Sequence, residues 1–182
     1  MIDVKTADRE LQTYIRPQTF PVAIRMLKAG EPIPDKARRP ARDFGKLSMN
    51  CQVIDMARRY GWTIALTRDD SICSLGITAL GFDRPTHLYN SGTLCEGMYT
   101  ATKEAGARSE AAVDKFAPGE YEALLVAPLD RATFEPHVVV IYANPAQVMR
   151  LTQAALWRTG GRLASSFQGR MDCADIIVTT MQ

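Results

Sequence analysis

The stretch from Phe44 to Phe82 constrains the fold more than any other part of this chain. Its middle, "WTIALT" at residues 62–67, is a short run of apolar and β-forming residues, which is typical of a strand. A helical pattern precedes this run, with Ser48 as its N-cap and Gly61 as its end, and a shorter helical pattern follows it. The order helix, strand, helix predicts a fold in which helices pack on a β-sheet.

The cysteines occupy similar local positions. All four fall in or just beyond the first turn of a predicted helix: Cys51, Cys73, Cys95 and Cys173. Free backbone N–H groups and the positive end of the helix dipole favour a negative charge at such positions. A thiol there tends toward the thiolate, which is the form that binds metals and attacks electrophiles. Burial as small apolar core residues is the alternative interpretation of each cysteine.

The rest of the chain supplies further helices and strands. Additional helices are predicted at about residues 3–15, 91–105 and 109–116, at 145–160 with Asn144 as N-cap and Pro145 at the first position, and after Asp172. Additional strands are predicted at residues 21–27, 121–127, 138–142 and 162–169, and the β-branched residues of 121–127 and 138–142 suggest central strands. We therefore expect one α/β (or α+β) domain over residues 1–182, with a mixed sheet of about five strands.

Two helices carry an apolar stripe that we expect to face the core. In the helix at 48–60 the stripe consists of Met49, Val53, Met56, Ala57 and Tyr60. Cys51 lies on the opposite side of this helix, with Arg58 nearby. In the helix at 145–160 the stripe consists of Val148, Leu151, Thr152, Ala155 and Leu156.

Composition and charge exclude several classes of protein. The net charge of +2 is too small for a general nucleic-acid or anionic-membrane surface. No apolar run approaches the roughly 20 residues that span a bilayer, and the N-terminus lacks the features of a signal peptide. We expect a cytoplasmic location, where cysteines are usually thiols, metal ligands or core residues rather than disulfides.

Common catalytic and nucleotide-binding motifs are absent from the sequence. There is no Gly-x-Ser-x-Gly elbow, no phosphate-binding loop of the Walker type, no His-Glu-x-x-His and no Cys-x-x-Cys. The intervals of 22 residues between Cys51 and Cys73 and between Cys73 and Cys95 match no standard iron–sulfur spacing. Any shared thiol site must therefore be assembled by the fold.

The sequence resembles a prokaryotic family catalogued as domain of unknown function 169. The segments that carry the resemblance are "FPVAIRML", "CQVIDMARRYGWTIALTRDDSICSLGITALGF", "PGEYEALLVAPLDRATFEPHVVVIYANPAQVMRLTQA" and "SSFQGRMDCAD". The resemblance implies that Cys51, Cys73 and Cys173 occupy recurring cysteine positions, whereas Cys95 does not. It also implies further motif positions at Arg58, Gly76, Gly81, Asn144, Pro145, Gly169, Arg170 and Asp175. Members are expected to continue past the Cys173 motif with another Gly-rich segment, whereas this sequence stops at Gln182.

Three functional hypotheses follow. In the first, Cys51, Cys73 and Cys173 bind an iron–sulfur cluster or another soft metal for electron transfer or redox sensing, with Arg58, Gly76 and Arg170 beside the cofactor. The second is a metal-free binding module for a small anion, held by Arg58, Arg170, the helix N-termini and a basic loop containing Lys36, Arg38, Arg39, Arg42 and Lys46. The third is a thiol enzyme with Cys73 as nucleophile and His87 or His137 as base. A redox partner, a second subunit or a homo-oligomer would suit these hypotheses, and a nucleic-acid or membrane partner would not.

Overall fold

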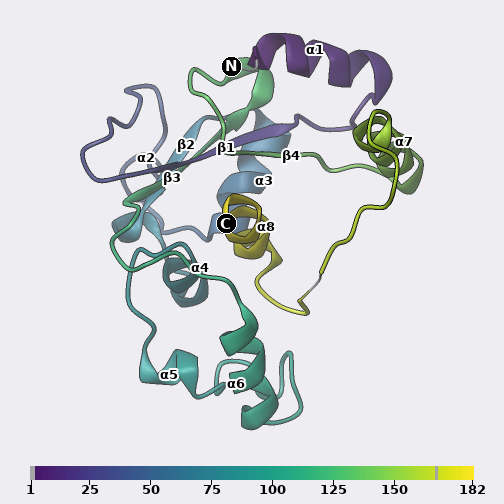
Figure 1. Cartoon of the computed structure of the whole chain (residues 1–182). Helices are drawn as coiled ribbons and strands as arrows, with labels where there is room; N and C mark the ends of the chain where they lie inside the picture. Colours follow the sequence, from purple (N-terminus) through teal and green to yellow (C-terminus); the bar gives the residue numbers. More distant parts are fainter. Residues whose placement is uncertain (1–2, 167) are drawn as a thin grey trace.

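A computed structural model describes residues 3–166 and 168–182, and a four-stranded antiparallel sheet lies at its centre (Figure 1). The strands are β1 (Val22–Leu27), β2 (Ile64–Thr67), β3 (Ala123–Pro128) and β4 (Val138–Val140), in the spatial order β2-β3-β1-β4. Each neighbouring pair is antiparallel, and the register places Ile24 and Ile64 on either side of Val126.

The α/β class is confirmed, and the sheet differs from the expectation in detail. Four strands are present in the described residues where about five were expected, and the sheet is antiparallel rather than mixed. Of the predicted strand at 162–169, Phe167 lies outside the described residues and the others form no strand. The two segments rich in β-branched residues, which form β3 and β4, were both expected to be central. Strand β3 is central, whereas the short strand β4 pairs with β1 alone and therefore lies at an edge.

Alternation along the strands gives the sheet two different faces. One face carries the larger apolar residues, including Ile24, Leu66 and Val126, and packs against residues of α3, α4 and α8. The other face is rich in alanine, including Ala23 and Ala127, and is covered by α1 and by loops. Fully burying one large aliphatic side chain stabilises the fold by about 1.5–3 kcal/mol, so the face with the larger residues supplies most of the core.

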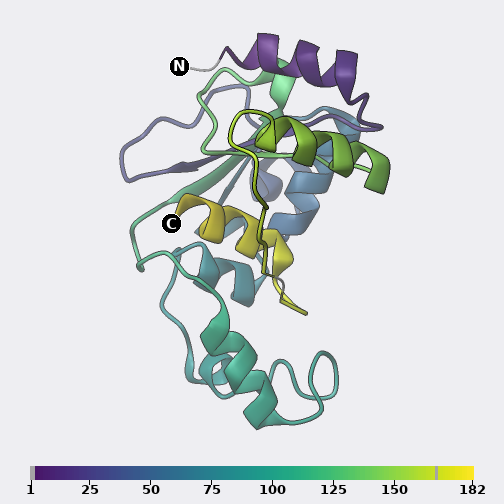
Figure 2. The same ribbon diagram turned by 45° about the vertical axis from the view of Figure 1, so that its right-hand side comes forward.

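Eight α-helices surround the sheet in the described part of the chain: α1 (Val4–Tyr14), α2 (Pro40–Phe44), α3 (Asn50–Tyr60), α4 (Ser74–Ala79), α5 (His87–Asn90), α6 (Lys103–Ala112), α7 (Pro145–Leu156) and α8 (Asp172–Met181). Two 3-10 turns, η1 (Arg68–Asp70) and η2 (Leu129–Arg131), follow β2 and β3. Helices α5 and α6 form an extension that projects from the body of the molecule, while α3, α4 and α8 lie together on one side of the sheet (Figures 1 and 2). No helix in these residues is long and apolar enough to cross a membrane.

The buried face of α3 is shifted from the predicted stripe. Its buried residues are Asn50, Val53, Ile54 and Ala57, whereas Met49 and Tyr60 are exposed. Asn50 rather than Met49 contacts the neighbouring helices, through Cys173 of α8 and Gly76 of α4. Cys51 remains exposed, as the sequence analysis expected.

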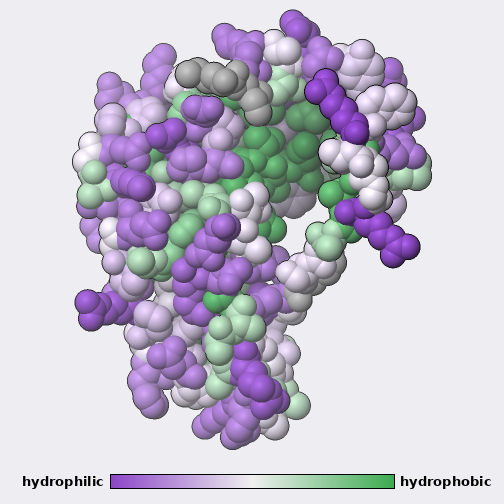
Figure 3. Space-filling model, viewed as in Figure 1, coloured by the Kyte–Doolittle hydropathy of each residue, from purple (hydrophilic) through white to green (hydrophobic). Residues whose placement is uncertain are grey.

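Helix α7 has the predicted N-terminus but not the predicted buried face. Asn144 caps the helix through a reciprocal exchange of hydrogen bonds with Gln147, and Pro145 occupies the first position. None of the residues of α7 is buried, because the helix contacts the end of α1 through polar groups and stands away from the sheet (Figure 1). A space-filling view shows apolar residues gathered in a hollow between the body and α7 (Figure 3).

Candidate functional site

The starts of α3 and α4 are held side by side by backbone hydrogen bonds. The N–H of Ser48 donates to the carbonyl of Asp70 at 2.8 Å, and the N–H of Ile72 donates to the carbonyl of Ser48 at 3.1 Å. This short parallel bridge immediately precedes both helices, so Cys51 and Cys73 begin their helices close together although 22 residues separate them.

The buried carboxylate of Asp70 anchors this bridge. It accepts hydrogen bonds from the Arg39 guanidinium at 2.5 Å, from the N–H of Thr67 at 3.0 Å and from the N–H of Ala41 at 3.1 Å. Burial alone would raise the pKa of Asp70, but these hydrogen bonds outweigh burial and hold the pKa below its ordinary value. Asp70 therefore remains charged at neutral pH and fixes the loop that leads to Cys73.

Three of the four cysteines line one pocket of about 380 Å³ between the starts of α3, α4 and α8. Cys51 and Cys173 are the second residues of α3 and α8, and Cys73 is the N-cap of α4. Gly76 and Arg170 also line the pocket, and the remaining walls are mostly apolar: Met49, Ile72, Leu75, Leu94, Met98, Tyr99 and Met171. The fold thus brings together five of the six residues that the sequence analysis placed in a shared site.

Asn50, which also lines the pocket, connects the starts of α3, α4 and α8. Its Nδ2 donates to the sulfur of Cys173 at 3.2 Å, and the side chain is almost fully buried. Gly76 makes room for it, because a Cβ atom at residue 76 would lie 2.6 Å from the Asn50 Oδ1. The N–H of Gly76 donates to the sulfur of Cys73 at 3.3 Å. Gly76 is therefore needed for close packing of α4 against α3.

The pKa values of Cys51 and Cys173 are shifted in opposite directions. A hydrogen bond from the Cys173 thiol lowers the pKa of Cys51 to about 6, and the same interaction together with burial raises the pKa of Cys173 above its ordinary value. At neutral pH the exposed Cys51 is then largely a thiolate, while Cys173 keeps its proton. A thiolate is the stronger nucleophile and the better metal ligand.

Cys95 lies in a different environment. Its thiol is fully buried, donates to Glu110 Oε1 at 3.3 Å and accepts a hydrogen bond from Arg170. Arg170 also pairs with Glu110 at 2.5 Å, and both ionic side chains are buried. Burial raises the pKa of the Cys95 thiol, and the Glu110 carboxylate raises it further. This cluster of Cys95, Glu110 and Arg170 ties α6 to the segment that begins α8.

The segment before α8 carries an unusual backbone conformation. Met171, which lines the pocket, has a φ of 71°, the left-handed region that side chains other than glycine rarely adopt. Such a conformation costs about 1–2 kcal/mol and must be held by surrounding contacts. The neighbouring Arg170, paired with the buried Glu110, supplies such a contact.

Several predicted site residues lie outside this pocket. Arg58 binds Asp55 and stacks on the ring of Tyr142, with its guanidinium carbon 3.9 Å from the ring centre. In the basic loop, Arg39 binds Asp70, Arg42 binds Asp43 and Arg38 stacks on Trp62. The basic loop therefore stabilises its own conformation and lines no part of the pocket.

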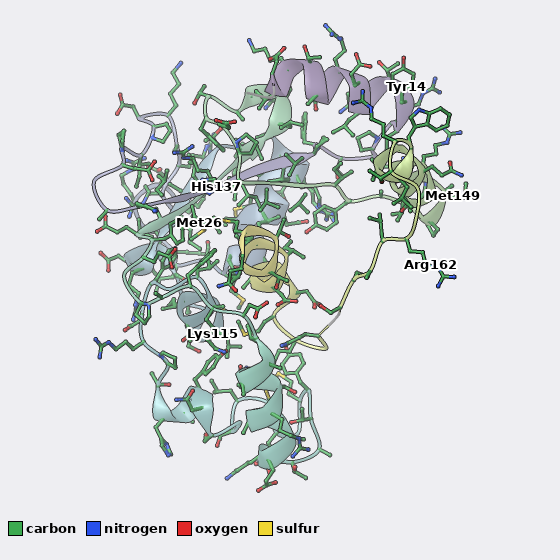
Figure 4. All side chains as sticks on the ribbon, in the orientation of Figure 1. Tyr14, Met26, Lys115, His137, Met149 and Arg162 are labelled. Carbon is green, nitrogen blue, oxygen red and sulfur yellow. The ribbon has the colours of Figure 1, made fainter. Side chains whose placement is uncertain are left out.

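Neither histidine is placed to act as a base for Cys73. The Nδ1 of His137 accepts a hydrogen bond from the backbone N–H of Met26 at 3.2 Å, so this ring is held at the sheet (Figure 4). His87 is the first residue of α5, in the projecting extension. Neither ring lines the pocket that contains Cys73.

The sequence analysis missed three residues that shape the site. Asn50 directly precedes Cys51, and its burial depends on contacts with α4 and α8 that no local pattern reveals. Glu110 was interpreted only as part of a helix, although it is buried beside Arg170. Tyr99 lines the pocket, and the Arg170 guanidinium carbon lies 5.0 Å from its ring centre.

Comparisons with known proteins agree with the sequence resemblance. A model of the DUF169 family, described as "Uncharacterised ArCR", matches residues 10–182. A protein of Methanocaldococcus jannaschii named "Uncharacterized protein MJ0308" is 29% identical over 158 residues, which is 86% of this chain. The chain spans 66% of that relative's own length. No solved structure matches the chain.

Proposed function

The chain belongs to the DUF169 family, and we propose that the protein binds a soft metal ion or an iron–sulfur cluster through Cys51, Cys73 and Cys173, for electron transfer or redox sensing. The observation that carries this proposal is the shared pocket, in which three helix starts present thiols that lie far apart in the sequence. One of these thiols, Cys51, is already shifted toward the thiolate. Soft ions such as Cu(I), and iron–sulfur clusters, prefer thiolate ligands.

Metal binding would require a small rearrangement of the pocket. Among the described residues, no three His, Cys, Asp or Glu side chains are close enough together to hold a metal ion as they stand. Rotation about the Cα–Cβ bond moves a cysteine sulfur between staggered positions, and Cys51 is exposed. Three thiolates would leave one position of a four-coordinate metal open for an exogenous ligand or a partner.

The remaining lining residues suit a soft ligand. Met49, Met98 and Met171 place three thioether side chains around the same pocket. Thioethers are soft donors, and the apolar walls would limit the access of water to a bound metal or cluster. Hard cations such as Mg²⁺ prefer oxygen ligands, which this pocket supplies poorly.

Anaerobic purification followed by metal and sulfide analysis tests this function. We expect the wild-type protein to carry a soft metal, or iron with sulfide and visible absorption, and Cys73→Ser to lose it with no change in circular dichroism. Cys95→Ala, which removes a thiol outside the pocket, serves as the matched control and should retain the metal. A folded wild-type protein that is colourless, contains no metal and takes none up on reconstitution would contradict the proposal.

A small anion is a second candidate for the ligand of this pocket, because one nitrogen of Arg170 has no hydrogen-bond partner among the described residues. The Arg170 Nε is buried without a hydrogen-bond partner in the described residues, and this side chain lines the pocket. The positive charge of Arg170 is, however, neutralised by Glu110, which weakens its attraction for anions. Thermal-shift measurements on metal-free protein with inorganic phosphate and with acetate would detect such binding, which should be lost in Arg170→Lys.

A further inference from the structure

The contact between α3 and α8 permits a reaction that needs no metal. We propose that, in the metal-free protein, Cys51 and Cys173 form a redox-active dithiol that a low-molecular-weight disulfide oxidises to an intramolecular Cys51–Cys173 disulfide. This reaction needs only the two thiols, so it can be tested whether or not the protein binds a metal. Where a metal binds, the disulfide would consume two of its three proposed ligands, and oxidation would then block metal uptake.

Both cysteines lie at the starts of helices that pack together, and both line the same pocket. Cys51 and Cys173 each occupy the second position of their helices, and α3 and α8 pack against each other at the core. The sulfur of Cys173 accepts a hydrogen bond from Asn50, the residue beside Cys51, and both cysteines line the same pocket. Figure 2 shows the two helices on the same side of the sheet.

Exposure assigns the two cysteines different roles. Cys51 is exposed and also borders a second surface depression beside Asp55 and Tyr142, so a small disulfide can reach it from solvent. Cys173 is less exposed, because Asn50 and the start of α8 cover its sulfur. Cys51 is thus placed to attack the reagent, and Cys173 is placed to resolve the product.

The reaction balances as two thiol–disulfide exchanges. In the first, the Cys51 thiolate attacks one sulfur of a disulfide RSSR, forms a Cys51–S–SR bond and releases RS⁻. In the second, Cys173 loses its proton to solvent and its thiolate attacks the Cys51 sulfur, so that the S–SR bond breaks and a second RS⁻ leaves. The two RS⁻ groups take up two protons from solvent, which replace those released by Cys51 and Cys173, so the sum is one disulfide reduced to two RSH and one protein dithiol oxidised.

Cys73 and Cys95 are the alternative partners within the chain. Cys73 lines the same pocket, but its sulfur accepts a hydrogen bond from the N–H of Gly76 within its own helix. Cys95 is enclosed by Glu110 and Arg170. Tryptic digestion separates these possibilities, because the sequence predicts Cys51 in peptide 47–58 and Cys173 in peptide 171–182. Cys73 and Cys95 share the predicted peptide 69–103, since the bond between Arg84 and Pro85 resists trypsin.

The experiment uses chelator-treated, fully reduced protein that is exposed to glutathione disulfide without oxygen, then alkylated, digested and analysed by mass spectrometry. We expect peptide 47–58 joined to peptide 171–182 as the main oxidised product, and dithiothreitol should separate the two peptides again. On a non-reducing gel the oxidised protein should run as a monomer, as the reduced protein does. A link between 47–58 and 69–103, a link between two chains, or recovery of all four cysteines as alkylated thiols would each overturn the proposal.

Single variants test the order of the two exchanges. Cys173→Ser should stop after the first exchange and accumulate glutathione on Cys51, with at least about tenfold more mixed disulfide than in wild type. Cys51→Ser should accumulate little glutathione on Cys173, because that sulfur is covered. Cys73→Ala should still yield the link between 47–58 and 171–182. Circular dichroism of each variant verifies folding, and a Cys173→Ser protein that is folded yet carries no glutathione on Cys51 would contradict the assigned roles.

Discussion

The pocket thiols and Cys95 show how the same side chain acquires different properties within one molecule. Cys51, Cys73 and Cys173 line a pocket at three helix starts, whereas Cys95 lies between α5 and α6, enclosed by Glu110 of α6 and by Arg170 before α8. A hydrogen bond lowers the pKa of Cys51, while burial raises that of Cys95. The comparison teaches that burial and hydrogen-bond partners, rather than proximity to a predicted helix start, separate reactive thiols from structural ones.

The largest expected difference between the two regions is in chemical reactivity. At neutral pH we expect iodoacetamide to modify Cys51 at least about a thousandfold faster than Cys95, because Cys95 must first be exposed by unfolding of its surroundings. Mass spectrometry of a time course in native buffer measures both rates, and the same reaction in urea should bring the rates together. Comparable rates in the native protein would remove the distinction between the two regions.

The next largest effect concerns the buried ion pair beside Cys95. Arg170→Met leaves the Glu110 carboxylate buried without its partner, and we expect a loss of about 3–5 kcal/mol in the free energy of unfolding. Urea denaturation followed by circular dichroism measures this loss. Adding Glu110→Gln to Arg170→Met removes the stranded charge and should restore part of the stability. No recovery in the double variant would indicate that Arg170 acts by packing alone.

On the other side of the comparison, the pKa of Cys51 should depend on Cys173. The rate of Cys51 alkylation should rise with pH through a midpoint at about 6, because the thiolate forms as the pH passes the pKa. Cys173→Ala removes the hydrogen-bond donor, so the midpoint should move up toward about 8.5, the ordinary value for cysteine. An unchanged midpoint would show that another group stabilises the thiolate.

A smaller effect is expected at the glycine that lets α3 and α4 approach. Gly76→Ala places a Cβ against the Asn50 Oδ1, and we expect a loss of about 1–3 kcal/mol together with slower trapping of glutathione by the pocket thiols. Gly169→Ala is the matched control, because no heavy atom lies within 4 Å of the added Cβ, and it should change stability by less than about 0.5 kcal/mol. Equal effects of the two substitutions would argue against the close contact at Asn50.

Local patterns predicted most of the sheet and several helices, because strand alternation and helix caps depend on neighbouring residues. The N-cap at Asn144 is an example, since its partner Gln147 is only three residues away. The prediction was wrong for the helix at 91–105. There Gly92 and Gly97 adopt φ values of 75° and 74°, and Gly92 packs against the backbone of α6 so closely that a side chain would clash. Helix α6 begins instead after Thr102, whose side chain caps it.

The sequence analysis named residues that the fold brings to one pocket, but not how the pocket is built. Cys51, Cys73, Cys173, Gly76 and Arg170 line it, and their service as one binding site stays a prediction. Arg58 was expected on the same side of the helix as Cys51, but it binds Asp55, stacks on Tyr142 and does not line this pocket. Such placements depend on tertiary contacts, which periodicity along the chain does not encode.

Cadmium titration of the reduced protein tests the shared thiolate site most directly. The thiolate-to-cadmium charge-transfer absorption increases with the number of bound thiolates, so it counts the cysteines around one ion. The wild-type protein and Cys95→Ala should each show three thiolates per bound Cd²⁺, whereas Cys51→Ser, Cys73→Ser and Cys173→Ser should each bind Cd²⁺ more weakly and show no more than two. A wild-type signal that none of the three pocket substitutions reduces, or no signal at all from the folded protein, would contradict the account.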